Sequence, residues 1–155
     1  MHARMPTEPA QASGWRAEVR AVAEDNLRLL RAHPWLIDIH DPRVALGPGT
    51  IAKYDRELHA FDGLGFTAVD RDAALSFVLD FTLSAAARMR EEESADSFAA
   101  SWAEAAPRLA AYLGDGMPLA RSVGQAAGES MGAPYDTRAA WDFGLARVID
   151  GLAGT

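Results

Sequence analysis

The chain has 155 residues, of which 49% are hydrophobic and 24% charged, and its formal net charge at pH 7 is −7. This length and composition fit one globular domain with a sizeable core. The acidic balance and the single lysine, Lys53, argue against DNA or RNA binding by this chain, because phosphate contacts depend on clustered basic residues. The lack of cysteine excludes disulfides, thiol nucleophiles and cysteine metal sites.

The N-terminal segment, residues 1–13, carries two prolines and small polar residues and has no apolar stretch. We expect a flexible linker without a secretory signal there, followed by one domain over residues 14–155. No uncharged run is long enough to span a bilayer, since Asp80 divides the best candidate. The expected protein is therefore cytoplasmic and makes no membrane contact.

The first predicted helix runs from about Gly14 to Ala32, with Ser13 as its N-cap and with Trp15 and Val19 on its apolar face. Asn26 falls on that same face. Its amide is either a satisfied core group or a polar group pointed into a cavity.

A short second helix is predicted to begin at Pro34, since proline is well tolerated at the first helical position. The next helix is predicted over residues 50–62. Its apolar positions recur every three or four residues: Ile51, Tyr54, Leu58 and Phe61. Gly63 and Gly65 are predicted to end it in a left-handed conformation.

One long helix is predicted from about Val69 to Glu93, because no glycine or proline interrupts this stretch. Between Ala73 and Ala87 its apolar residues surround the helix axis. A helix that is apolar on all sides must be covered on all sides. The chain has few helices to do this, so we expect a second copy to supply part of the cover.

After the long helix, Ser94 and Asp96 are predicted to restart a helical pattern that continues through Phe98 to Leu113, with a kink or break near Pro107. A weaker helix through Leu119 and Val123 is predicted to follow. The segment 128–134 is expected to be loose. Asp136 or Thr137 should cap a last helix, in which the interior glycine Gly144 indicates close approach of another helix. No segment alternates with period two, so the fold class is all-α.

Several stretches, in this order, resemble the effector-binding core of TetR-family transcriptional regulators, especially actinobacterial members. They are Trp15-Arg16, Leu29-Leu30-Arg31, His33-Pro34-Trp35-Leu36, Gly47-Pro48, Gly65-Phe66, Phe81-Thr82-Leu83 and the closing segment Trp141–Leu152. The resemblance implies a helical domain that binds a small apolar or amphiphilic effector. It also implies a homodimer formed through a four-helix bundle of the long helix and the last helix.

In this family the effector shifts the dimer between two arrangements of attached helix-turn-helix heads. The present sequence begins where such heads would end, so we expect no nucleic-acid contact by this chain. The tetracycline-responsive branch holds its magnesium-bound drug with a histidine, and the matching position here is Ala45. The resemblance therefore does not imply that mode of binding.

Two sets of site residues follow from the resemblance and from position on the helices. The expected effector pocket is lined by Val22, Asn26, Trp35, Tyr54, Leu58, Phe61, Leu75 and Leu79. The alternative is that the same side chains fill a core. The expected dimer interface contains Phe81, Ala85, Ala140, Trp141, Gly144, Leu145 and Val148.

Parts of the sequence are also compatible with other functions. His33, Asp38, His40, Asp41 and His59 could converge on a metal in a small helical enzyme, but their irregular spacing does not favour a metal site. No catalytic motif or cofactor loop is present in the sequence. A partner that lacks heads and pairs with full-length regulators is a further alternative. The polar positions Ser76, Asp80 and Ser84 form a solvated stripe, a polar seam in the dimer or a wall of the pocket.

Overall fold

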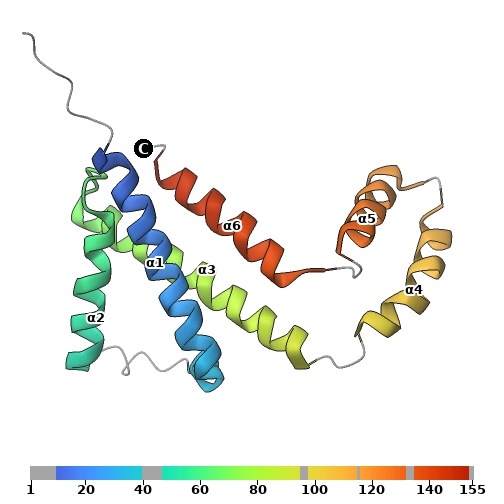
Figure 1. Cartoon of the computed structure of the whole chain (residues 1–155), viewed down its shortest axis with the longest axis horizontal. Coiled ribbons are helices and arrows are strands. Elements are labelled where there is room, and N and C mark those ends of the chain that lie inside the picture. The colour runs from blue at the N-terminus through green and yellow to red at the C-terminus, as the bar shows by residue number, and fades with distance from the viewer. Residues whose placement is uncertain (1–9, 40–46, 95–97, 115, 132–134, 154–155) are drawn as a thin grey trace, which may run out of the picture. The chain divides into compact units, whose positions relative to one another are not determined.

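The structure, a computed structural model, describes residues 10–39, 47–94, 98–114, 116–131 and 135–153 (Figure 1). Its helices are α1 (Ala10–Ala32), η1 (Pro34–Asp38), α2 (Pro48–Leu58), η3 (His59–Phe61), α3 (Ala68–Ser94), α4 (Phe98–Leu113), α5 (Pro118–Met131) and α6 (Thr137–Leu152). Elements η1 and η3 are short 3-10 helices. Over the described residues there is no strand, so the all-α prediction is confirmed.

The chain divides into two compact units. Unit 1 comprises residues 1–87 and 143–155, and unit 2 comprises residues 88–142. Each unit is described by itself below.

Helix α1 begins earlier in the chain than the predicted N-cap, Ser13. Ser13 lies inside the helix, which starts at Ala10, so the prediction of Ser13 as the N-cap is wrong. Four residues of the expected linker are therefore helical, and residues 1–9 lie outside the described residues. Capping residues favour a helix start but do not force one when the preceding residues, here alanine and glutamine, are themselves good helix formers.

The turn between η3 and α3 has the predicted backbone. Gly63 and Gly65 have φ values of +86° and +69°, a region that glycine occupies without steric cost. At the start of α3, the Thr67 side chain accepts a hydrogen bond of 3.1 Å from the backbone N–H of Asp70. This capping contact fixes where the long helix begins.

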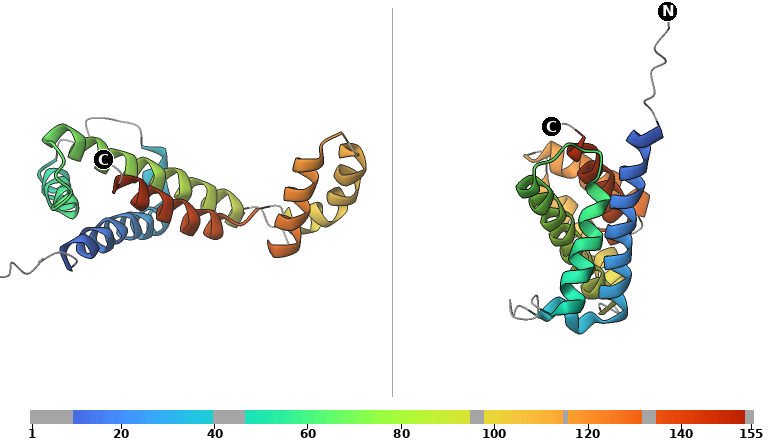
Figure 2. Two further views of the ribbon diagram at one scale, coloured as in Figure 1. Left: turned by 90° about the horizontal axis from the view of Figure 1, so that it is seen from above. Right: turned by 90° about the vertical axis from the view of Figure 1, so that its left-hand side faces the viewer.

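The core of unit 1 is built on one face of α1. Trp15, Val19, Ala23 and Leu27 recur every four residues and are buried. Helix α1 packs against η3, where Phe61 is fully buried. Helix α2 lies beside α1 and runs in the opposite direction (Figure 2).

The long helix α3 agrees with its predicted extent. In unit 1 its buried positions are Ala74, Leu75, Val78, Thr82 and Ala86. The buried Thr82 hydroxyl donates to the carbonyl of Val78 at 2.8 Å, so it leaves no unpaired polar group in the core. Phe77 and Leu83 nevertheless remain exposed, so the single chain covers only part of this apolar helix.

Unit 2 decides between two predicted outcomes at Pro107 and departs from another sequence prediction. Helix α4 continues through Pro107, so no break occurs there, and the alternative of a kink stays a prediction. Helix α5 extends to Met131, so residues 128–131 are helical although a loose segment was predicted, and residues 132–134 lie outside the described part. The prediction for the last helix is confirmed, because the Asp136 carboxylate accepts a 2.8 Å hydrogen bond from the N–H of Ala139.

Candidate functional site

A groove of about 430 Å³ lies between α1 and α2 in unit 1. Helix α1 contributes apolar and polar side chains to its wall, whereas the side chains from helix α2 are all charged. The lining residues are Ala21, Val22, Asp25, Asn26, Leu29, Lys53, Arg56 and Glu57. Its size falls within the range usual for small-molecule sites, which is roughly 300–1,000 Å³.

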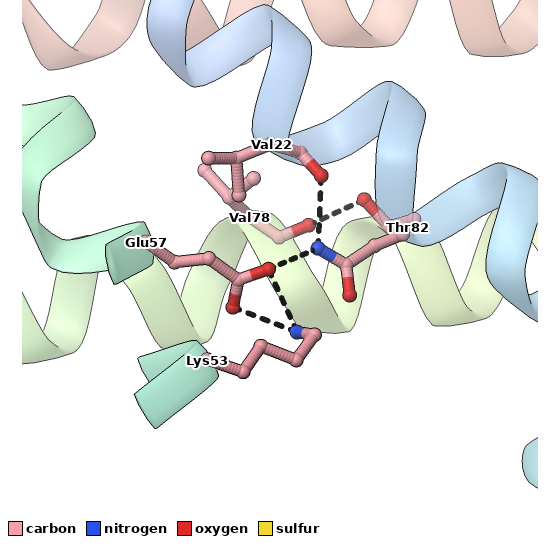
Figure 3. Close-up of polar contacts among 6 residues, drawn as sticks. Val22, Lys53, Glu57, Val78 and Thr82 are labelled. Atoms are coloured by element: carbon pink, nitrogen blue, oxygen red, sulfur yellow. Dashed lines mark hydrogen bonds and ion pairs between the residues drawn. The ribbon is translucent and has the colours of Figure 1, made fainter. Parts of the chain in front are cut away.

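The groove contains a buried carboxylate, Glu57, whose side chain is 9% exposed. Figure 3 shows this carboxylate extending from α2 toward α1, with the ammonium group of Lys53 beside it. Asn26 Nδ2 donates to Glu57 Oε1 at 2.7 Å, and Lys53 Nζ lies 2.7 Å from each of the two carboxylate oxygens. Burial of a charge is costly unless it is paired and hydrogen-bonded, and here both conditions are met.

The side-chain nitrogen of Asn26 donates two hydrogen bonds in this network. Besides Glu57, its Nδ2 donates to the backbone carbonyl of Val22 at 2.8 Å, one helical turn earlier on α1. The two alternatives that the sequence left open for Asn26 therefore both hold in part. Its amide is satisfied, and it lines the groove.

Polar contacts also join the C-terminal end of α2 to α3. Tyr54 donates to Asp72 at 2.6 Å, and this hydrogen bond raises the pKa of the tyrosine above its usual value of 10.0. Arg71 donates to Asp62 at 2.5 Å, and His59 Nδ1 lies 3.0 Å from the other oxygen of Asp62. The contact with Asp62 raises the pKa of His59, and the contacts with His59 and Arg71 lower the pKa of Asp62.

The eight residues predicted to line a pocket differ in where the structure places them. Val22 and Asn26 lie in the groove. Phe61 and Leu75 are buried in the core, at 0% and 1% exposure, as the alternative of a filled core expected. Leu58 and Leu79 are half-buried, whereas Tyr54 and Trp35 are exposed, Trp35 to 60%. Whether any of the eight contacts an effector stays a prediction.

A second groove, of about 510 Å³, lies between α4 and α5 within unit 2. Its wall is mainly apolar and includes Trp102, Leu109 and Gly124. Gln125 donates to Glu129 at 2.8 Å, but both side chains are exposed. Among the described side chains of α4 and α5 none is buried, so this groove lacks the fixed polar group that the α1–α2 groove has.

The family model "Tetracyclin repressor-like, C-terminal domain" matches residues 8–155, which is almost the whole chain. The chain belongs to this family. It is 28% identical over 145 residues to the HTH-type transcriptional repressor DrrR1 of Streptomyces coeruleorubidus. The match covers 90% of this chain and 52% of the repressor, so the chain spans about half the length of the curated relative it matches. No solved structure matches the chain.

Membership of this TetR-like family confirms the resemblance seen in the sequence and identifies the chain as a regulator domain rather than an enzyme. In the described part of the chain, no group of three histidine, aspartate or glutamate side chains is placed to hold a metal ion. His40 and Asp41, two of the candidate ligands, lie outside the described residues. None of the described helices is both long enough and apolar enough to cross a membrane.

Some of the residues predicted for a TetR-type dimer interface are already packed or buried within the single chain. A Cβ atom added to Gly144 would lie 2.7 Å and 2.8 Å from two ring carbons of Phe81, so α6 and α3 approach closely within one chain. This explains the interior glycine. Trp141 and Leu145 are 1% and 0% exposed and have no area left for a partner to cover, whereas Phe81, Ala85, Ala140 and Val148 keep some exposure.

The stripe Ser76, Asp80 and Ser84 is exposed along α3. None of the three lines the α1–α2 groove or the α4–α5 groove. A solvated stripe and a seam against a second copy both remain consistent with their position.

Sequence reasoning missed Glu57 and Lys53. The two residues are four positions apart on α2, a spacing that usually indicates an exposed ion pair on a helix surface. The available signal was that Asn26, already assigned to an inward face, needed a buried acceptor.

Proposed function

We propose that this chain is the effector-binding and dimerisation part of a transcriptional regulator and that the α1–α2 groove is its effector site. The observation that carries the proposal is the buried carboxylate of Glu57, fixed by Asn26 and Lys53 in the wall of a partly apolar groove. Ligand sites combine apolar walls with a few fixed polar groups in this way. The expected effector is small and apolar or amphiphilic.

The same proposal includes a homodimer formed by α3 and α6. Phe77 and Leu83 of α3 and Phe143 of α6 are exposed to 56%, 38% and 70%. Exposed apolar side chains of this size on two neighbouring helices favour burial against a second copy, because removal of apolar surface from water is favourable. The four-helix bundle would then use the exposed faces of α3 and α6, while Gly144 and Phe81 hold the two helices together within each subunit.

A route from the groove to the dimer follows from the contacts of α2. This helix supplies Lys53 and Glu57 to the groove, and its Tyr54 is hydrogen-bonded to Asp72 of α3. Suppose that α2 can occupy two positions in the subunit and that the effector binds more tightly to one of them. Binding would then favour the corresponding position of α3. In a longer regulator of the kind named for the relative, this would alter the spacing of DNA-binding heads in the cytoplasm.

The effector part of the proposal is tested by a thermal-shift screen of small apolar and amphiphilic molecules. A ligand that binds the folded state raises the melting temperature by mass action. Ala21→Trp places a large ring in the groove, and Glu18→Trp places the same ring on an exposed part of α1 outside it. We expect stabilising compounds to lose their effect in Ala21→Trp and to keep it in Glu18→Trp. Compounds that act equally on both variants would contradict the assignment of the groove.

The dimer part is tested by sedimentation equilibrium of the whole chain. We expect a mass of twice the 16.6 kDa of the monomer, and a shift toward monomer in Phe143→Asp because a charge would replace an apolar contact. A monomer of wild-type chain at high micromolar concentration would contradict the bundle.

A further inference from the structure

We propose that the α1–α2 groove selects amphiphilic cations, whose ammonium group replaces that of Lys53 at the Glu57 carboxylate. This inference rests on the proposed function and adds to it the chemical class of the ligand. It starts from a difference between the two charged partners in the groove, one of which is fixed while the other can leave.

Glu57 is the fixed partner. Its side chain is 9% exposed and accepts a hydrogen bond from Asn26, whose amide is itself anchored to the Val22 carbonyl on α1. A carboxylate held in this way cannot turn to solvent without breaking the contact between α1 and α2. The position of its carboxylate is therefore a fixed feature of the groove wall.

Lys53 is the partner that can leave. Its side chain is 34% exposed, and the flexible four-carbon stem of a lysine lets the ammonium group reach water by rotation alone. If a ligand ammonium takes its place, Glu57 keeps a cation within hydrogen-bond distance and Lys53 is solvated. Neither charge is left buried and unpaired, so the exchange avoids the main cost of disrupting a buried ion pair.

An anionic ligand cannot replace a charged group of the groove in this way. It could approach Lys53 or the exposed Arg56, but its charge would then lie near the Glu57 carboxylate, which cannot withdraw. A like charge near a buried carboxylate is unfavourable. The apolar part of a cationic ligand would meet Ala21, Val22 and Leu29 on α1. Asp25 also lines the groove, but it is exposed and already paired with Arg28.

The test uses three probes with one fluorescent apolar skeleton and different charges: 9-(aminomethyl)anthracene, 9-anthracenemethanol and 9-anthracenecarboxylate. Fluorescence titration of the whole chain measures the three affinities at pH 7. We expect the amine to bind about tenfold tighter than the alcohol, as for a hydrogen bond to a charged group, and the carboxylate to bind most weakly.

Three variants locate the effect. Glu57→Gln should abolish the preference for the amine, while Asp25→Asn, which removes an exposed carboxylate of the same groove, should retain it. Lys53→Gln should tighten binding of the amine several-fold, because it removes the internal competitor for Glu57. If Lys53 had a purely structural role, Lys53→Gln would weaken binding of the amine instead. The Lys53→Gln affinity therefore tests the exchange even if Glu57→Gln fails to fold.

Equal binding of the three probes, a preference that survives Glu57→Gln, weaker amine binding in Lys53→Gln, or no amine binding at all would each overturn the inference. The proposed function fails separately, when compounds from the wider screen are indifferent to Ala21→Trp. A groove that binds neutral compounds and loses them in Ala21→Trp would leave the proposed function standing and remove the selectivity for cations.

Discussion

The helix pair α1–α2 and the helix pair α4–α5 differ in how far their side chains are buried. In unit 1 one face of α1 is buried against the core, and even the charged Glu57 is buried because Asn26 and Lys53 satisfy it. In unit 2 the described side chains of α4 and α5 are half-buried or exposed, and Tyr112 and Leu119 are 82% and 75% exposed. A large groove is therefore weak evidence for a ligand site unless fixed polar groups line it.

The largest expected effect contrasts one aromatic side chain from each unit. Phe61→Ala should lower the free energy of unfolding by about 3–5 kcal/mol, because the ring is fully buried and leaves a cavity. Tyr112→Ala on α4 should change it by less than about 0.5 kcal/mol. Urea denaturation of both variants measures the difference, and similar losses would mean that α4 is covered in solution.

A smaller loss is expected at the contact between α6 and α3. Gly144→Ala should destabilise the chain by about 1–3 kcal/mol, since the new methyl group meets the Phe81 ring and the packing must shift. Gly151→Ala on the same helix is the control, because a Cβ there meets nothing within 4 Å and alanine favours the helix. Phe81→Leu should restore stability to Gly144→Ala. Equal effects of the two glycine substitutions in thermal denaturation would disprove the close approach.

The start of α6 provides a test within unit 2. Asp136→Ala should cost about 0.5–2 kcal/mol, because the N–H of Ala139 loses its acceptor at the helix N-terminus. Asp136→Asn keeps an acceptor oxygen and should retain most of the stability. Chemical denaturation followed by circular dichroism compares the two, and equal losses would show that the carboxylate does not act as a cap.

The smallest expected effect is a pH dependence at the surface contact of His59 with Asp62. The raised pKa of His59 gives stability that is present below pH 6.5 and lost as the pH rises through the folded-state pKa. The lowered pKa of Asp62 gives stability that is present above pH 3.8 and lost as the pH falls through its folded-state pKa. His59→Gln should therefore lower the melting temperature slightly between pH 3.8 and pH 6.5, and it should have no such effect at pH 8.

The matched control for this pair is Asp62→Asn, in which the histidine has lost its partner carboxylate. In that background His59→Gln should have a smaller pH-dependent effect, because only the charge of Asp55 still raises the pKa of His59. A melting-temperature difference that persists unchanged from pH 5 to pH 8 would assign the effect of His59 to packing instead of charge.

Local sequence signals predicted much of the fold. Proline and glycine positions identified η1 and the turn at Gly63 and Gly65, and the uninterrupted stretch identified α3. The ends of helices were less predictable, as Ser13 shows, because several adjacent residues can start a helix at similar free energy. Pro107 within α4 shows that a local penalty does not always end a helix.

The candidate site was predicted only on its α1 side. The sequence placed Val22 and Asn26 on an inward face, and the structure places both in the groove. On α2 periodicity favoured an inward stripe with Tyr54, whereas Tyr54 is exposed and Glu57 is buried. Periodicity ranks faces by apolarity alone, so it cannot recognise a polar residue whose burial depends on partners from another helix.

The central claim, that the α1–α2 groove is the effector site, is tested most directly by hydrogen exchange. Amide exchange is measured by mass spectrometry on the whole chain, with and without the most stabilising compound from the thermal-shift screen. The account predicts that the compound slows exchange most in α1 and α2, around Val22–Leu29 and Lys53–Glu57. Slowing confined to α4 and α5 would contradict it and assign the effector to the other groove.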